Sequence, residues 1–184
     1  MSFYNLDQIE VLIDETTLQN RIQDLGVQIT QDYRDQGDLV LICILKGSYL
    51  FLADLSRAID LPLTVDFMAV SSYGKGFRSS GVVRLVQDLS ENIENKNVLI
   101  VEDIIDTGLT MSYLLENLRT RKPASLKIVS LLHKPSKAKV KIDIDYLGFA
   151  IEDRFVIGYG LDYLGQFRNM PFIGVNLGED APLS

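Results

Sequence analysis

Three runs of apolar residues constrain the fold of this chain more than any other feature. They are "LVLICIL" at residues 39–45, "NVLIV" at 97–101 and "SLKIVSLL" at 125–132. Segments with helical periodicity lie around them, in which apolar residues recur at steps of three and four. Strands with successive apolar residues that alternate with amphipathic helices are typical of a parallel sheet covered on both faces. We therefore predict an α/β fold with a central, mostly parallel sheet flanked by helices.

Periodic apolar residues and helix-ending residues predict the positions of the other elements. A helix capped by Asp14 and closed by Gly37 carries the first stripe, and a helix that ends before Pro123 carries the second. We also expect a short helix at 48–59, strands at 63–70 and 82–88, and shorter strands in "FVIGY" and "FIGV". The stripes consist of Leu18, Ile22, Leu25, Ile29 and Tyr33, and of Met111, Leu114, Leu115 and Leu118. With 184 residues, 47% of them hydrophobic, the chain suits one core, so we predict a single domain over residues 1–184.

Charge and composition exclude several classes of function. A net charge of −7 argues against a broad basic surface for nucleic acid. Cys43 has no second cysteine to pair with, and its apolar surroundings indicate core packing. Asp7 and Glu10 lie where a signal peptide would need a basic start and an apolar stretch. Because the longest aliphatic run, 39–45, is far shorter than a membrane span, we expect a cytoplasmic protein without membrane or nucleic-acid partners.

The stretch "NVLIVEDIIDTGLT", residues 97–110, drives an apolar strand into three carboxylates, those of Glu102, Asp103 and Asp106. The small residues that follow open a helix, and the N–H groups of such a loop can bind phosphate together with nearby hydroxyls. Carboxylates repel phosphate, so they would serve sugar hydroxyls, a metal ion or a developing positive charge. A phosphorylated sugar satisfies all three roles. The alternative is a capped helix whose acidic residues favour the helix dipole.

Polar side chains also follow the other apolar runs. Lys46 comes directly after the first run, and Lys134 follows the third. In open parallel sheets, ligands bind beyond the carboxyl ends of the strands. The same edge of the sheet would therefore bring these lysines near the carboxylates.

The stretch "VLIVEDIIDTGLT" resembles the phosphoribosyl-pyrophosphate (PRPP) signature of the type I phosphoribosyltransferases, and "EDIIDTG" is similar to the form found in hypoxanthine-guanine phosphoribosyltransferases. "LKGSYLF", "SSYG", "SLLHK" and "DRFVIGYGLDYLGQFRN" follow the family's order and spacing, so the resemblance covers roughly residues 8–176. Leu109 lies where mammalian-type enzymes carry a lysine, which indicates the bacterial branch. The resemblance implies a core at about 35–150, a small hood from about 1–14 and 151–184, and a mobile lid at about 71–81.

The resemblance also implies roles for residues of the PRPP site. Glu102 and Asp103 would contact the ribose hydroxyls or Mg²⁺, and Asp106 would be the catalytic residue that accepts or donates the proton at N7 of the purine. Lys46 and Gly47 would form a pyrophosphate loop with a cis peptide bond between non-proline residues, and Arg168 would be a second pyrophosphate ligand. The 5′-phosphate would bind to Asp106, Thr107, Gly108, Leu109 and Thr110.

At the purine end, the resemblance implies that Lys134 donates to O6 and that Phe155 stacks on the base. The backbone of Val156 would meet the Watson–Crick edge, and Asp162 would hold a second Mg²⁺ at this end of the site. Taken alone, Lys134 and Arg168 are typical of solvated surface residues, Phe155 of core and Asp162 of a cap. Weaker candidates lie in the lid, and three lysines would form a solvated basic face beside a structural His133. The lid candidates are Ser72, Tyr73, Lys75 and Arg78. The lysines of the basic face are Lys137, Lys139 and Lys141.

The resulting prediction is a purine-salvage enzyme. It would transfer 5-phosphoribose from PRPP to N9 of hypoxanthine or guanine through an oxocarbenium-like transition state, giving IMP or GMP and pyrophosphate with Mg²⁺ as cofactor. The family implies a homo-oligomer, either a dimer or a tetramer. A PRPP-sensing regulator that binds nucleic acid is the alternative, but it would need a basic face and would not need Asp106. A phosphorylase would not explain the PRPP loop.

Overall fold

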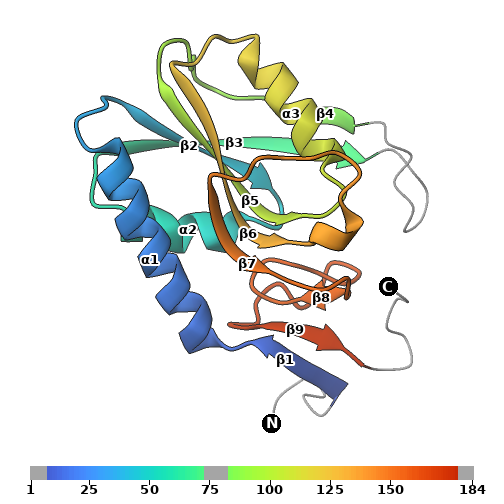
Figure 1. The fold of residues 1–184 in the computed structure, drawn as a ribbon. Coiled ribbons are helices and arrows are strands. Elements are labelled where there is room, and N and C mark those ends of the chain that lie inside the picture. Colours follow the sequence, from blue (N-terminus) through green and yellow to red (C-terminus); the bar gives the residue numbers. More distant parts are fainter. Residues whose placement is uncertain (1–7, 73–82, 178–184) are drawn as a thin grey trace.

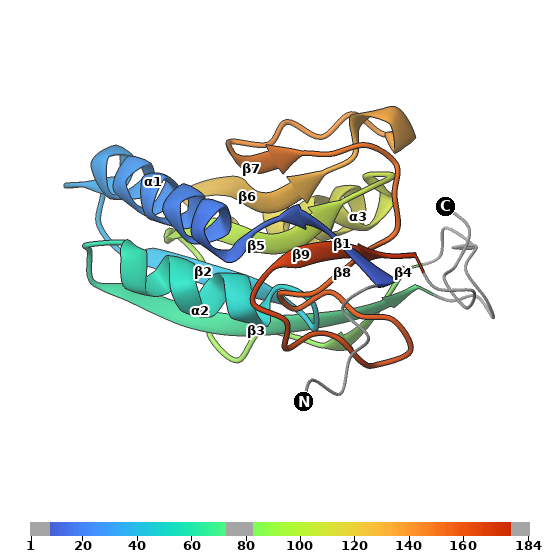
Figure 2. The ribbon, with the colours of Figure 1, turned by 90° about the horizontal axis from the view of Figure 1, so that it is seen from below.

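The computed structural model describes residues 8–72 and 83–177, and a six-stranded sheet forms its centre (Figures 1 and 2). The strand order is β4-β3-β2-β5-β6-β7, in which only the β3–β4 pair is antiparallel. The strands are β2 (Leu39–Leu45), β3 (Leu63–Ser72), β4 (Val83–Gln87), β5 (Asn97–Ile105), β6 (Ser125–His133) and β7 (Tyr146–Ala150). The predicted fold class, a mostly parallel sheet flanked by helices, is confirmed.

Helices cover both faces of this sheet. Helices α1 (Glu15–Tyr33) and α2 (Tyr49–Ala58) pack on one face, and α3 (Leu109–Arg119) packs on the other (Figure 1). The sequence stripes explain this arrangement, because the predicted stripe of α1 is buried throughout. On α3, Met111, Leu114 and Leu118 are buried and Leu115 is partly buried.

The ends of α1 and α2 agree with the predicted signals. Asp14 caps α1, since its Oδ1 accepts a hydrogen bond of 2.8 Å from the Thr17 amide. The turn that follows α1 contains Gly37 in the left-handed conformation, with φ of 87°. α2 spans Tyr49–Ala58, within one residue of the predicted bounds at each end, and the chain leaves it before Pro62.

A second, three-stranded sheet is built from the two ends of the chain. Its order is β1 (Ile9–Ile13), β9 (Ile173–Asn176) and β8 (Val156–Ile157), all antiparallel. Figure 1 shows these strands together at one end of the molecule, and this small sheet is the predicted hood. Gly160, between β8 and β9, lies against Gly47 just beyond the end of β2, so the hood faces the carboxyl end of that strand.

The structure departs from the predicted strands at β5, β7, β1 and β8. β5 continues to Ile105 instead of stopping at Val101, so the acidic pair lies within the strand. β7 and β1 were not predicted as strands, and "FVIGY" contributes only the two residues of β8. In the part of the chain that the structure describes, no helix is long and apolar enough to cross a membrane.

Candidate active site

The acidic pair of β5 lies where the strand is still paired with β6. Glu102 is opposite Ser130, and the pairing continues to Ile105. Glu102 Oε2 is buried without a hydrogen-bond partner, and burial together with the charge of Asp103 holds the pKa of the Glu102 carboxyl well above its usual range. Burial also raises the pKa of Asp103 to about 6, although its Oδ1 accepts a 2.8 Å hydrogen bond from the Ile104 amide. Buried polar atoms without partners are rare and typical of binding sites.

The loop after the acidic pair forms a small pocket of about 90 Å³ at the start of α3. Gly108 precedes the helix in the left-handed conformation, with φ of 79°. The Leu109 amide makes only a long contact of 3.5 Å, to Thr107 Oγ1, so it remains open to a ligand. Asp106 Oδ1 is buried without a partner at the same pocket. The pocket is lined by Glu102, Ile104, Ile105, Asp106, Thr107, Gly108, Thr110 and Met111.

The backbone behind this loop fixes its position. The amides of Lys139 and Val140 both donate to the Thr107 carbonyl, at 3.0 and 3.1 Å. A Cβ atom added at Gly108 would lie 2.5 Å from the Val140 carbonyl oxygen, so this close approach needs glycine. The segment after β6 therefore holds the loop from behind.

The end of β2 lies beside Asp103. The peptide bond between Leu45 and Lys46 is cis, the feature that the resemblance implied for this loop. A Cβ atom at Gly47 would lie 1.5 Å from Asp103 Oδ2, and one at Gly160 would lie 1.9 Å from the Gly47 carbonyl oxygen. Gly47 is thus enclosed between an acidic side chain and the hood, while Lys46 is exposed.

Arg168 and Asp162 reach this region from the segment between β8 and β9. Arg168 pairs with Asp162 Oδ1 at 2.5 Å and donates to the carbonyl of Gly160. Asp162 also accepts a 2.7 Å hydrogen bond from the Gly165 amide. The charges of both side chains act on the pKa of Asp103, that of Arg168 lowering it and that of Asp162 raising it. The structure therefore gathers Arg168, Asp162, Gly47 and Asp103 in one place.

Lys134 follows β6 and is buried, with 6% of its surface exposed. Its Nζ lies 3.5 Å from Asp153 Oδ1, and the Nζ of Lys137 lies 2.8 Å from the same oxygen. The interaction with Lys137 is the largest of the effects that lower the pKa of Asp153. Lys137, expected on a solvated basic face, is about one-third exposed and pairs with Asp153. Lys139 and Lys141 are exposed, as predicted.

The other predicted residues of the purine end and the lid lie as follows. Phe155 is partly buried, and its ring meets that of Tyr163 edge-on, with centroids 5.9 Å apart. Val156 is buried at the start of β8. Ser72 ends β3, whereas Tyr73, Lys75 and Arg78 and almost all of the predicted lid lie outside the described residues.

The donor atoms suit magnesium when substrate oxygens complete the ligand set. Among residues 8–72 and 83–177, no group of three or more histidine, cysteine, aspartate or glutamate side chains is arranged to hold a metal by itself. Mg²⁺ usually takes one or two carboxylates together with phosphate oxygens and water. The buried, unpartnered Oε2 of Glu102 beside Asp103 fits that pattern.

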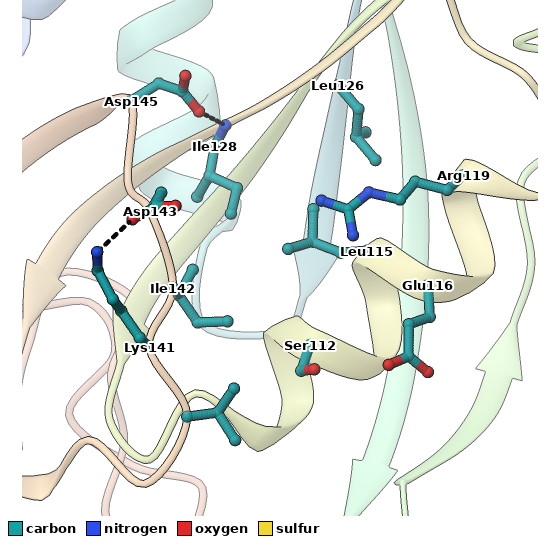
Figure 3. A pocket seen from close by; sticks show the side chains of 11 residues that line it. Ser112, Leu115, Glu116, Arg119, Leu126, Ile128, Lys141, Ile142, Asp143 and Asp145 are labelled. Atoms are coloured by element: carbon teal, nitrogen blue, oxygen red, sulfur yellow. Dashed lines mark hydrogen bonds and ion pairs between the residues drawn. The ribbon is translucent and has the colours of Figure 1, made fainter.

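A larger pocket of about 310 Å³ lies away from these residues (Figure 3). It is bounded by α3, the start of β6 and the segment 140–145. Figure 3 shows Lys141 paired with Asp143 and the Asp145 carboxylate accepting from the Ile128 amide. None of its lining residues was predicted for the site.

Sequence reasoning missed Asp153, Lys137 and Gly160 as neighbours of the site. Asp153 stands directly before the "RF" of the predicted purine segment, which is the one local signal that could have indicated it. Its pairing with Lys134 depends on the adjacent ends of β6 and β7, which spacing along the chain does not reveal.

Comparisons with known proteins agree with this geometry. A family model described as "Phosphoribosyl transferase domain" matches residues 14–164. The hypoxanthine-guanine phosphoribosyltransferase of Bacillus subtilis (strain 168) is 50% identical over 166 residues, which cover 90% of this chain and 92% of that protein. The hypoxanthine phosphoribosyltransferase of Escherichia coli (strain K12) is 48% identical, covering 90% and 94%. A crystal structure of a hypoxanthine phosphoribosyltransferase from Staphylococcus aureus is similar, with a TM-score of 0.88, 48% identity and 92% of each chain covered.

Proposed function

The chain belongs to the phosphoribosyl transferase domain family, and we propose that it transfers 5-phosphoribose from PRPP to N9 of hypoxanthine or guanine. The products are IMP or GMP and pyrophosphate, so the reaction is one of purine salvage. The names of relatives that are about half identical over nine-tenths of the chain support this substrate class.

One observation carries the proposal: a buried acidic pair directly precedes an open phosphate-sized pocket at a helix start. Glu102 Oε2 has no partner, and the pocket contains the Thr107 and Thr110 side chains. Phosphate binds to the loop, and the carboxylates lie where ribose is attached to that phosphate. Their negative charge stabilises the oxocarbenium-like cation that forms as pyrophosphate leaves.

The other residues divide the remaining tasks. Lys46, Gly47 and Arg168 bind pyrophosphate, the last two from positions beside Asp103. Asp106, whose Oδ1 is buried and unpartnered, exchanges the N7 proton of the purine. Lys134 donates to O6 and so selects 6-oxopurines. Phe155, Val156 and Asp162 complete the purine end of the site.

Magnesium belongs to this proposal as cofactor. Glu102 and Asp103 would hold it, with Asp162 at a second position, and when bound it neutralises charge on the leaving pyrophosphate. Turnover is expected to stop in EDTA and to return when Mg²⁺ is added in excess. Full activity in the chelator would contradict the metal assignment. We further propose a cytoplasmic homo-oligomer, a dimer or a tetramer, which sedimentation analysis would distinguish from a monomer.

A spectrophotometric assay tests the proposed reaction directly. The protein is incubated with PRPP, Mg²⁺ and one base at a time: hypoxanthine, guanine, xanthine or adenine. Hypoxanthine or guanine is expected to give nucleotide and pyrophosphate, whereas adenine, which lacks O6, is not. Absence of product with either 6-oxopurine, or equal turnover of adenine, would overturn the proposal.

A further inference from the structure

Three charged side chains meet where β6 ends, and the proposed function uses one of them. Lys134 and Lys137 share one acceptor, Asp153 Oδ1, at 3.5 and 2.8 Å. The Lys134 side chain is 7% exposed, whereas those of Lys137 and Asp153 are about one-third exposed. The buried lysine therefore lies beside a partly exposed pair of opposite charges.

Both contacts are ion pairs of different closeness. The Lys137 ammonium lies 2.8 Å from Asp153 Oδ1 and the Lys134 ammonium lies 3.5 Å from it, and neither is oriented as a hydrogen bond to this oxygen. An ammonium group carries three donors and no acceptor. The closer Lys137 offsets part of the Asp153 charge that would otherwise hold Lys134, which leaves the Lys134 donors available to another acceptor.

The backbone holds this arrangement in place. The Lys134 amide donates to the Ile105 carbonyl at 3.0 Å, which fixes it beside the end of β5. A short 3₁₀ helix, Pro135–Lys137, then returns the chain, with the Lys137 amide 3.1 Å from the Lys134 carbonyl. Asp153 follows β7, where the Ile151 amide bonds to the His133 carbonyl at 2.9 Å. Adjacent strand ends thus set the spacing of all three side chains.

Lys137 also interacts electrostatically with Asp106. Its pKa is raised by the interaction with Asp153 and, to a smaller extent, by the negative charge of Asp106. Asp106 is the residue proposed to act at N7 of the purine, so Lys137 and Asp153 lie on the purine side of the site.

From this geometry we propose that Asp153 and Lys137 act as a positioning pair for Lys134. Asp153 draws the Lys134 ammonium toward the purine, and Lys137 prevents Asp153 from binding it fully. The inference rests on the proposed function, because the acceptor left for Lys134 is O6 of a 6-oxopurine. Neither residue of the pair touches the reacting atoms, and their effect is on purine affinity.

Steady-state kinetics of single variants test the pair. Lys137→Met keeps the length of the side chain but frees Asp153 to bind Lys134, so KM for hypoxanthine should rise about tenfold, as for one weakened charge-assisted hydrogen bond. KM for PRPP should not change, and Lys137→Arg should restore the wild-type value. Lys139→Met is the matched control, since Lys139 is an exposed lysine on the same segment. Asp153→Asn should also raise KM for hypoxanthine, because Lys134 loses the group that directs it.

Two further arms separate positioning from a general structural effect. In the Asp153→Asn background, Lys137→Met should not raise the hypoxanthine KM further, because the Asp153 charge that competes for Lys134 is already removed. Unsubstituted purine, which lacks O6, should inhibit wild type and Lys137→Met equally. Three outcomes would contradict the proposed positioning role. Lys137→Met could raise the hypoxanthine KM equally in both backgrounds, or purine could inhibit Lys137→Met less than wild type. The hypoxanthine KM could also stay unchanged in both single variants. Wild-type protein that fails to convert hypoxanthine would instead overturn the proposed function.

Discussion

Glu102 and Asp103 occupy positions where folding disfavours their charged forms. Burial is the largest cause of the raised pKa in both, and the negative charge of Asp103 raises the pKa of Glu102 further. A chain that only needed a stable strand would place apolar residues here, as it does at Val101 and Ile105. Burying two carboxylates lowers the stability of the fold, and a ligand that carries positive charge or hydroxyl donors explains why they are there.

Asp103→Asn should therefore stabilise the free protein while it removes activity. Burial raises the folded-state pKa of Asp103 from 3.8 to about 6. The ionised form costs stability as the pH rises through this window, and below it wild type and variant should be equally stable. At pH 8 the variant should be more stable by about 1 to 3 kcal/mol. Urea unfolding in EDTA between pH 4 and 8 measures this difference, and a variant that is less stable at pH 8 would contradict it.

Asp106→Asn tests the third carboxylate. The amide keeps the shape of the side chain but cannot take up a proton, so kcat should fall by roughly 10²- to 10⁴-fold. The loop amides that we propose to hold the phosphate do not depend on this charge, so PRPP affinity by calorimetry should stay close to that of wild type. Should the variant keep full turnover, Asp106 would only support the start of α3.

The sequence predicted those residues of the site that lie in its motifs, and it could not predict their cross-chain partners. Glu102, Asp103 and Asp106 lie in one contiguous string, and Lys134 follows an apolar run after a single histidine. Asp153 shows no comparable signal, because its importance comes from the neighbouring strand ends that bring it to Lys134. The chain also carries many other solvated carboxylates that read the same way in sequence.

At the scale of elements, the strand errors arise mainly where polar residues lie within or beside a strand. β5 was expected to end where its carboxylates begin, yet it pairs with β6 as far as Ile105 because β6 is long enough to continue beside it. β7 was missed because "YLGFA" is short and follows a stretch rich in lysine and aspartate. Its Gly148 lies directly against the Leu131 carbonyl, a contact that only the assembled sheet reveals. The longer, strongly periodic helices α1 and α3 were predicted well.

Gly108 links β5 to α3 and allows a test at this scale. Gly108→Ala puts a Cβ atom 2.5 Å from the Val140 carbonyl oxygen at a position with φ of 79°. The loop must move, and a shift on the order of 1 Å in a binding group can cost about 100-fold, so PRPP affinity should fall about 10- to 100-fold. Calorimetric titration with PRPP measures this loss.

Gly37→Ala is the matched control for that experiment. Gly37 has φ of 87°, but no atom of the described structure lies within 4 Å of its added Cβ. Only the left-handed backbone strain remains, which should lower stability by about 1 to 2 kcal/mol and leave PRPP affinity unchanged. Equal PRPP affinities in the two variants would show that the Val140 contact does not position the loop.

At the scale of the whole molecule, the site is assembled between the large sheet and the segment that joins two strands of the small one. The large sheet supplies the acidic pair, the phosphate loop and Lys134, while the segment between β8 and β9 supplies Asp162 and Arg168. The hood meets the core where Gly160 lies against Gly47 and where Tyr159 contacts both helices of one face. Correct placement of Arg168 therefore depends on how the hood is held.

Tyr159→Phe tests this dependence. The Tyr159 hydroxyl donates to Asp54 of α2, which also accepts from Gln19 of α1 at 3.0 Å. Burial, first of all, and the bond to Asp54 raise the pKa of the Tyr159 hydroxyl, so it remains a neutral donor at every working pH. Its loss should lower the free energy of unfolding by about 1 kcal/mol, the usual net value of one hydrogen bond.

The same change should act on binding at a distance. Gly160 follows Tyr159 directly and accepts from Arg168, so a looser Tyr159 should raise KM for PRPP while KM for hypoxanthine changes less. Urea unfolding and steady-state kinetics measure the two effects, and Tyr113→Phe, on α3 at the opposite face of the sheet, is the control. If Tyr159→Phe lost stability without any change in the PRPP KM, Tyr159 would hold the hood against helix α2 without positioning Arg168.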